Sequence, residues 1–121
     1  MKYDENNIFA KILRGEIPCN KIYENDFVLS FYDINPQKKI HALVIPKGKY
    51  IDLDDFHMNA SNEEIIGLMK GVTTVAKKLG ISSIDGKGYR ALANISDYGG
   101  QEVPHLHFHL FGGEKVGKMV S

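Results

Sequence analysis

The feature that most constrains this sequence is a run near its C-terminal end in which histidine and apolar residues alternate. The run reads His105-Leu-His-Phe-His-Leu-Phe111 and holds three of the chain's five histidines. Successive side chains of a β-strand point to opposite faces, so one face carries the three imidazoles and the other carries Leu106, Phe108 and Leu110. The run therefore predicts a strand from Val103 to Phe111 that is anchored in a core by one face and presents a row of imidazoles on the other.

A metal site is one explanation of this row. Two histidines at positions i and i+2 of a strand can both reach one zinc ion. Strand residues rise by about 3.3 Å each, so His105 and His109 would be about 13 Å apart. A single ion with bonds of ~2 Å cannot take all three histidines unless the strand bends. A metal site would use two of the histidines and leave the third without a role.

Nucleophilic catalysis is the second explanation. An imidazole is neutral and nucleophilic near pH 7, and it can form a covalent intermediate that divides one displacement into two steps. Phosphorus chemistry suits it, because flanking imidazoles can donate hydrogen bonds to phosphate oxygens where negative charge accumulates. This explanation uses all three histidines. A strand that carries histidine on its polar face by coincidence would explain one histidine, but three in strict alternation disfavour it.

The rest of the chain predicts a small α+β domain built on an antiparallel sheet of about five strands with two helices. The expected elements, in order, are a short helix capped by Asn6 or Asn7 and stopped by Gly15, strands at Lys21–Glu24, Phe27–Asp33 and His41–Ile45, a helix from Ser61 to Gly80, and strands at Tyr89–Ala93 and Val103–Phe111. Ser61 and Glu64 form a capping box that marks the start of the long helix. The unbroken apolar run 42–45 predicts a strand that is buried on both faces.

Composition limits the partners and the compartment. The 121 residues suit one domain, 1–121, and the 15 basic and 15 acidic side chains balance. This balance removes the usual electrostatic reason to expect nucleic acid or an anionic membrane as a partner. Cys19 is the single cysteine, so an internal disulfide is excluded. The start of the chain lacks the basic and apolar pattern of a secretory signal, and we expect a cytoplasmic protein.

Four blocks of the sequence resemble one known family, in the same order along the chain. They are Ile8–Pro18, Phe31–Gln37, His41–Lys47 and Gly99–His105, and the last leads into the histidine run. Together they resemble the histidine triad (HIT) superfamily of nucleotide hydrolases and transferases, and within it the Hint-like nucleotide-binding branch. The resemblance implies a HIT-like fold whose sheet extends across a homodimer, with a C-terminal tail of about residues 112–121 that reaches towards the partner subunit's site.

The resemblance also implies roles for individual residues. His107 would be the nucleophile that attacks the α-phosphorus, His105 and His41 would orient it through hydrogen bonds, and His109 would contact the phosphate or the departing group. Asp33 would bind the ribose hydroxyls. The residues that match the apolar enclosure of the base are Ile8, Phe9, Ile17, Phe31, Tyr32, Ile34 and Leu43, and those that match the phosphate-side loop are Asn94, Gly100 and the residue at position 102.

From the residues alone, several of these positions have plainer explanations. Asp33 precedes Asn-Pro and could end a strand in a turn, as could Asn94. Phe31 and Ile34 could be core residues, and His41 could be a hydrogen-bonded core histidine. His57, in a polar loop between a strand and a helix, receives no role.

Three positions depart from the family's pattern. Glu102 stands where some members carry a serine near the scissile phosphate. Asn7 and Ala10 stand where a bacterial branch carries a zinc-binding cysteine pair, so we expect no structural metal and no cofactor. Pro104 precedes the first histidine of the run, where an aromatic residue is common, and a proline favours a strand start or edge.

The sequence thus predicts a metal-independent hydrolase that cleaves the P–N bond of purine nucleoside 5′-phosphoramidates, which are conjugates of AMP or GMP, through a nucleotidyl-histidine intermediate. Transferases of the superfamily carry glutamine in place of His109, which favours hydrolysis. Two alternatives remain open: a dinucleoside polyphosphate hydrolase, and a nucleotide-binding regulatory or scaffold dimer with low activity.

Overall fold

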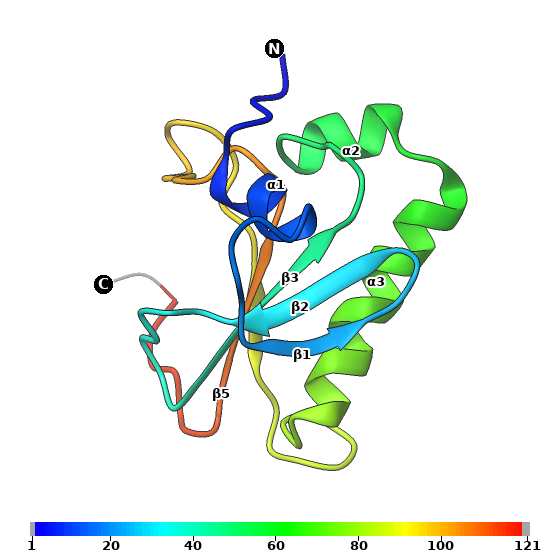
Figure 1. Cartoon of the computed structure of the whole chain (residues 1–121). Coiled ribbons are helices and arrows are strands. Elements are labelled where there is room, and N and C mark those ends of the chain that lie inside the picture. Colours follow the sequence, from blue (N-terminus) through cyan, green and yellow to red (C-terminus); the bar gives the residue numbers. More distant parts are fainter. Residues whose placement is uncertain (1, 120–121) are drawn as a thin grey trace.

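The computed structural model describes residues 2–119, in which five strands form a single antiparallel sheet (Figure 1). The strands are β1 (Lys21–Glu24), β2 (Val28–Tyr32), β3 (Ile40–Pro46), β4 (Arg90–Leu92) and β5 (Phe108–Gly112). Their order across the sheet is β1-β2-β3-β5-β4, and every neighbouring pair is antiparallel. The predicted α+β class with a five-stranded antiparallel sheet is confirmed.

The predicted short helix and long helix are present, and their ends follow the sequence signals. In α1 (Ile8–Leu13) the Asn7 side chain accepts a hydrogen bond from the backbone of Ala10, and Gly15 follows the helix with a positive φ of 78°. In α3 (Asn62–Lys78) the capping box of Ser61 and Glu64 is complete. The Ser61 hydroxyl accepts a hydrogen bond from the backbone amide of Glu64, and the Glu64 carboxylate accepts one from the backbone amide of Ser61, as the sequence predicts.

A third helix, α2 (Leu53–Asn59), was not predicted, and His57 lies in it rather than in a loop. The helix has seven residues, and Phe56 is its one buried side chain, so its sequence shows no helical periodicity. The Asp52 side chain caps it by accepting a hydrogen bond from the backbone of Asp55. This acidic cap was the available signal, because Asp is among the residues preferred at helix starts.

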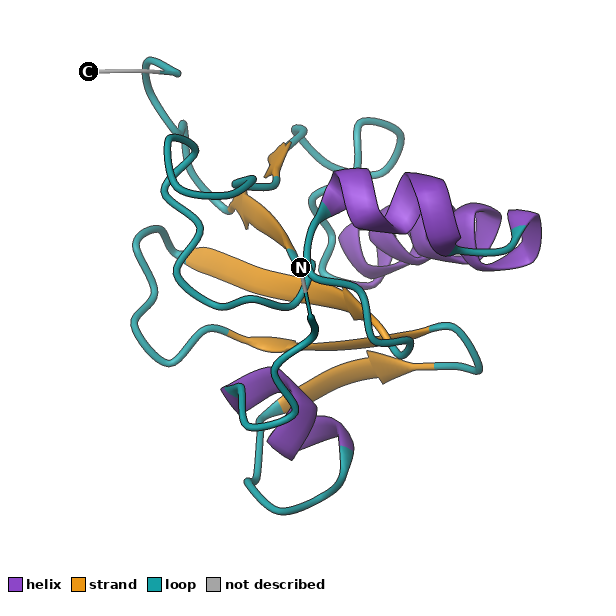
Figure 2. Cartoon of the chain, turned by 90° about the horizontal axis from the view of Figure 1, so that it is seen from above, coloured by secondary structure: helices purple, strands orange, loops and turns teal. Residues whose placement is uncertain are grey.

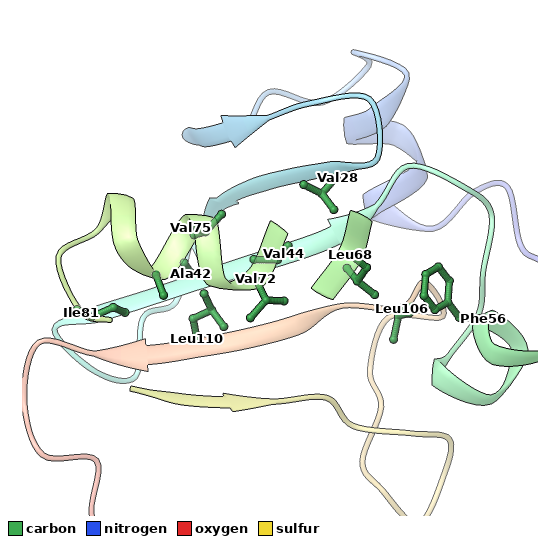
Figure 3. Close-up of a cluster of buried hydrophobic side chains, with 11 residues drawn as sticks. Val28, Ala42, Val44, Phe56, Leu68, Val72, Val75, Ile81, Leu106 and Leu110 are labelled. Atoms are coloured by element: carbon green, nitrogen blue, oxygen red, sulfur yellow. The ribbon is translucent and has the colours of Figure 1, made fainter. Parts of the chain in front are cut away.

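The two faces of the sheet pack against different helices (Figure 2). On one face α3 covers an apolar cluster, and Figure 3 shows its side chains between α3 and strands β2, β3 and β5. This cluster contains Val28, Ala42, Val44, Phe56, Leu68, Val72, Val75, Ala76, Ile81, Leu106 and Leu110. On the other face α1 packs against a smaller cluster, which contains Phe9, Leu29, Phe31, Leu43 and Ile45. Alternate residues of β3 enter the two clusters, so this strand is buried on both faces, as predicted.

The last strand is shorter than the prediction of Val103 to Phe111, which was wrong for residues 103–107. The backbone of His105 bonds to the carbonyl of Val103, two residues earlier, so the chain turns after Pro104 instead of extending. The amide of Leu106 then donates to the carbonyl of Tyr50, outside the sheet, at 2.8 Å. The alternation of faces nevertheless survives, because Leu106 and Leu110 both enter the cluster under α3.

The structure bears on two further features, membrane-spanning helices and the C-terminal tail. Within residues 2–119, none of the helices is long and apolar enough to span a membrane. The expected tail begins at the end of β5 and continues through residues 113–119 without regular structure. Its last two residues, 120–121, lie outside the described part of the chain.

Close contact between α3 and β2 predicts the effect of one substitution. A Cβ at Gly71 would lie 2.9 Å from both methyl carbons of Val28, which is fully buried. Alanine at a helical glycine ordinarily stabilises by about 1 kcal/mol. We expect Gly71→Ala to destabilise instead, by about 1–3 kcal/mol, because the core must shift. Urea unfolding measures the difference.

Thr74→Ala, on the exposed side of the same helix, is the matched control and should leave the stability nearly unchanged. A Gly71→Ala variant as stable as the wild type would contradict the close packing of α3 on the sheet.

Candidate active site

The imidazoles gather on the face of the sheet that α1 covers. His41 comes from β3 and His109 from β5, and their ring centroids are 5.2 Å apart. The His107 ring lies 5.1 Å from that of His109 and 5.0 Å from that of Phe9, which α1 supplies. The pairing of β3 with β5 places Leu43 opposite His109, so His41 and His109 are diagonal neighbours across the two strands. The structure therefore joins His41, predicted from a separate motif, to the histidine run.

His107 is held in one tautomer. Its Nδ1 lies 2.7 Å from the backbone carbonyl oxygen of His105, and a carbonyl only accepts hydrogen bonds. Nδ1 therefore carries the proton, and Nε2 of the neutral ring keeps its lone pair. Burial lowers the pKa of His107, although the bond to the carbonyl opposes this shift. His107 is thus an uncharged ring with a free, nucleophilic nitrogen at neutral pH.

His41 and His109 form a chain with a defined direction. The backbone amide of Gln37 donates to Nδ1 of His41 at 3.2 Å, so the proton of the neutral His41 ring is on Nε2. That nitrogen lies 2.9 Å from Nδ1 of His109 and 3.4 Å from a carboxylate oxygen of Asp33. His109 accepts through Nδ1 and therefore carries its own proton on Nε2. The chain leaves a hydrogen-bond donor on His109 beside the lone pair of His107.

The pKa values of both members of this chain are depressed. Burial lowers the pKa of His41, and the nearby carboxylate of Asp33 counteracts it. Burial, followed by the neighbouring His107 and His41, lowers the pKa of His109 to about 4. Both rings are therefore neutral at pH 7, and His109 offers a hydrogen bond rather than a full positive charge.

His105 is fully buried, and the protein itself occupies both of its ring nitrogens. Nε2 donates to the carbonyl of Pro46 at 2.9 Å, and Nδ1 lies 2.6 Å from the hydroxyl of Tyr3. Burial lowers the pKa of His105 to about 4. The sequence placed His105 as a residue that orients His107 through a hydrogen bond. In the structure the backbone carbonyl of His105 makes that bond, while its ring faces the protein interior.

The residues predicted to enclose a base divide into two groups. Phe9, Phe31 and Leu43 are buried together, and the rings of Phe9 and Phe31 meet edge to face at 5.6 Å. Ile8, Tyr32 and Ile34 are exposed, and Ile34 retains 87% of its surface. The expectation that Ile34 could be a core residue is therefore wrong. Ile17 is half-buried and lines an open pocket between α1 and β1.

The predicted phosphate-side residues lie on the loop 94–102. Asn94 is half-buried, and Gly100 is exposed with a positive φ of 74°. The exposed carboxylate of Glu102 acts on His107, whose pKa it raises slightly against the larger effect of burial. The loop is held by Gln101, which accepts from the backbone of Ser96 and donates to the carbonyls of Ile51 and Val103.

Sequence reasoning missed three residues of this site. Phe111 stacks parallel to His109 at 5.7 Å and lies 4.3 Å from His41, and its alternation with the three histidines was the available signal. Gln101 belongs to a quoted block but received no role. Tyr3 contacts His105 across 102 residues of sequence, and no local pattern could have revealed it.

A metal fits this arrangement poorly. Within residues 2–119, one group of potential ligands converges, Asp33, His41 and His109, whose ligand atoms lie within 4.8 Å of one another. A metal on Nε2 of His41 would move the ring proton to Nδ1, where it would face the amide hydrogen of Gln37. Of the two pairs that strand spacing allows, the one that includes His105 is also unsuited, because protein groups occupy both nitrogens of His105.

Comparison with known proteins identifies the family. The HIT domain model matches residues 14–116. A HIT-like protein of Azospirillum brasilense is 51% identical over 98% of this chain and 95% of that protein. The purine nucleoside phosphoramidase of Escherichia coli K12 is 40% identical over 97% of this chain and 95% of the enzyme. The chain belongs to the HIT family, and the resemblance found in the sequence is confirmed at that level.

Solved structures agree with this assignment. A HIT family hydrolase from Clostridium thermocellum superimposes with a TM-score of 0.84 at 38% identity and covers 98% of this chain and 99% of its own. A histidine triad protein from Clostridium difficile gives a TM-score of 0.81 at 37% identity and covers 98% of both chains. The HIT-like fold predicted from sequence is therefore confirmed.

The buried state of His105 predicts how stability depends on pH. Its pKa is about 4 in the folded protein and near 6.5 when the chain unfolds, so folding favours the neutral ring. The stabilisation is complete above pH 6.5 and is lost as the pH falls from 6.5 to 4. We expect the free energy of unfolding in urea to fall by about 2 kcal/mol between pH 7 and pH 5 from this histidine.

His105→Gln should show a smaller decline over the same range, whereas His57→Gln, at an exposed position, should decline like the wild type. An equal decline in the wild type and His105→Gln would contradict the burial of a neutral imidazole at this position.

Proposed function

We propose that this HIT protein hydrolyses the P–N bond of purine nucleoside 5′-phosphoramidates and releases a nucleoside monophosphate through a covalent intermediate on His107. The broader class, a nucleotide hydrolase of the HIT family, is confirmed by the relatives described above. The observation that carries the proposal is the 2.7 Å bond from Nδ1 of His107 to the carbonyl of His105, which leaves Nε2 free to attack. The 40% identity to the E. coli phosphoramidase supports the type of bond.

The reaction follows from the tautomers. The lone pair on Nε2 of His107 attacks the α-phosphorus, and the bond from phosphorus to the leaving nitrogen breaks with its electrons on that nitrogen. The nitrogen takes a proton from solvent and departs as the amine. His107, which keeps its Nδ1 proton, becomes a cation. Water then attacks phosphorus and loses a proton to solvent, and the electrons of the P–N bond to His107 return to Nε2.

The neighbouring groups favour each step. The carbonyl of His105 faces the positive charge that develops on His107 and stabilises it. The Nε2 proton of His109, which His41 fixes from behind, is positioned to bond to a phosphate oxygen. Because these donors are oriented before substrate arrives, little reorganisation is needed during the reaction.

The nucleotide would lie across the end of β2 and the start of α1. Asp33, whose side chain keeps 20% of its surface, would accept hydrogen bonds from the ribose hydroxyls. The backbone amide of Asn35 already orients this carboxylate by donating to Oδ1 of Asp33 at 2.8 Å. The base would contact exposed Ile8, Tyr32 and Ile34, backed by the buried residues Phe9, Phe31 and Leu43 and flanked by Ile17. Asn94 and Gly100 would lie on the phosphate side.

A homodimer is part of the proposal. β4 lies at the edge of the sheet, where a second copy could extend it, and the exposed side of α3 carries Ile66 and Met69 at 54% and 63% exposure. Burial of this edge and these side chains would join two copies through the sheet and the long helix.

Loss of the nucleophile is the first test of the mechanism. His107→Ala should lower kcat for an adenosine 5′-phosphoramidate by roughly 1000-fold or more, because it removes the lone pair that forms the intermediate. Binding of AMP should persist, since the proposed ribose and base contacts remain. Turnover and calorimetric titration, both in the presence of a chelator, measure the two quantities.

His57→Ala, on the exposed side of α2, is the control and should keep wild-type activity. Turnover by His107→Ala within a few-fold of the wild-type rate would refute the assignment of His107.

Glu102 should separate the two hydrolase hypotheses. Its exposed carboxylate would lie on the phosphate side and would repel a leaving group that is a polyphosphate more than one that is an amine. Glu102→Gln should raise kcat/KM for a diadenosine polyphosphate roughly 10-fold relative to the phosphoramidate, which corresponds to about 1.4 kcal/mol. The ratio of the two values is the measurement.

Glu63→Gln, an exposed carboxylate on α3, should leave this ratio unchanged. A wild-type protein that prefers the polyphosphate would support the alternative hydrolase, and tight nucleotide binding with negligible turnover would support a regulatory role.

A further inference from the structure

An N-terminal arm, residues 2–7, is fastened beside the active site rather than free. The carbonyl of Glu5 accepts from the guanidinium of Arg14 at 2.8 Å, and the carboxylate of Glu5 pairs with Lys49 at 2.8 Å. In Figure 1 this segment runs down past α1, next to the loop that leads into β5. The HIT domain match begins at residue 14, so the arm lies outside the segment that the family model covers.

Tyr3 joins the arm to the histidine run. The Tyr3 hydroxyl lies 2.6 Å from Nδ1 of His105, and the two rings meet edge to face at 5.6 Å and 72°. The other ring nitrogen, Nε2, faces the carbonyl of Pro46 and must carry the proton of the neutral ring. Nδ1 is therefore an acceptor, and Tyr3 is the donor.

We propose that Tyr3 is a positioning residue for catalysis: by donating to Nδ1 of His105, it fixes the segment whose carbonyl holds His107 in its nucleophilic tautomer. The catalytic part of this inference rests on the proposed function. The arm is thus part of the active-site architecture, and the hydroxyl of Tyr3 is the atom through which it acts.

The path from Tyr3 to His107 is short. The ring of His105 is tied at one nitrogen to Pro46 and at the other to Tyr3, so neither its orientation nor its tautomer can change. The carbonyl of the same residue accepts from Nδ1 of His107. Among residues 2–119, Tyr3 provides the one hydrogen bond to Nδ1 of His105. Without it a fully buried acceptor is unpaired, and the ring of His105 is held only by the bond from Nε2 to Pro46, about which it can tilt.

Loss of the hydrogen bond from Tyr3 to His105 has two consequences for His107. The bond from its Nδ1 to the carbonyl of His105 loosens, and a fraction of the rings moves the proton to Nε2, where no lone pair remains for attack. The carbonyl also stabilises less well the positive charge that develops on His107. The chemical step slows, whereas nucleotide binding does not change, because the Tyr3 hydroxyl acts on His105, whose ring nitrogens face protein groups and not the proposed nucleotide site.

Tyr3→Phe tests the inference, because it keeps the ring and removes the hydroxyl. We expect kcat for an adenosine 5′-phosphoramidate to fall about 5-fold, the loss of one ordinary hydrogen bond, with KM within 2-fold of the wild type. In ¹⁵N NMR of the full chain at pH 7, the Nδ1 resonance of His105 should move towards that of an unbonded nitrogen. The signals of His107 should show a loss of the Nδ1-protonated form.

Glu5→Gln is the matched control, since it removes the ion pair with Lys49 but keeps the hydroxyl. It should keep kcat and the histidine signals of the wild type.

Two results would overturn the inference. One is a Tyr3→Phe protein that unfolds at lower temperature but keeps wild-type kcat well below that temperature, which would make the contact purely structural. The other is an unchanged tautomer of His107. If the wild type does not cleave phosphoramidates at all, the proposed function fails, and the NMR comparison still decides whether Tyr3 fixes His107.

Discussion

The hydrogen bond from Nδ1 of His107 to the backbone carbonyl of His105 fixes which ring nitrogen carries the proton, and the proposed chemistry depends on it. An imidazole has two nitrogens, and a free histidine divides its proton between them. A buried carbonyl 2.7 Å from Nδ1 removes that freedom, because a proton on the other nitrogen would leave two acceptors facing each other. In the proposed mechanism the bond therefore selects the nucleophilic atom, and it faces the charge that would develop when this atom attacks phosphorus.

The sheet supplies the frame for this bond through the alternation of its two faces. Leu106 and Leu110 enter the core under α3, and this anchorage turns the intervening histidines to the opposite face. There the chain from the amide of Gln37 through His41 to His109 sets a second tautomer, which leaves a donor beside His107. A lone pair and a donor are thus oriented by backbone groups, and burial keeps every ring in the cluster neutral at pH 7.

The alternating run was enough to predict the opposite faces, and the capping box of Ser61 and Glu64 was enough to predict where α3 begins. The sequence did not predict that the chain turns at Pro104, because the amide of Leu106 is satisfied by Tyr50, a partner distant in sequence. Nor did it predict α2, which has one buried side chain and no periodicity. The approach of His41 to His109 and of Tyr3 to His105 depends on tertiary packing, and local patterns do not encode such contacts.

A crystal of the protein soaked with a nucleoside monophosphate tests the central claim most directly. Our account predicts that phosphorus lies in line with Nε2 of His107, that this nitrogen carries no proton, and that Nδ1 keeps its bond to the carbonyl of His105. A phosphate that approaches another imidazole, or a metal ion bound to Nε2 of His107, would contradict it.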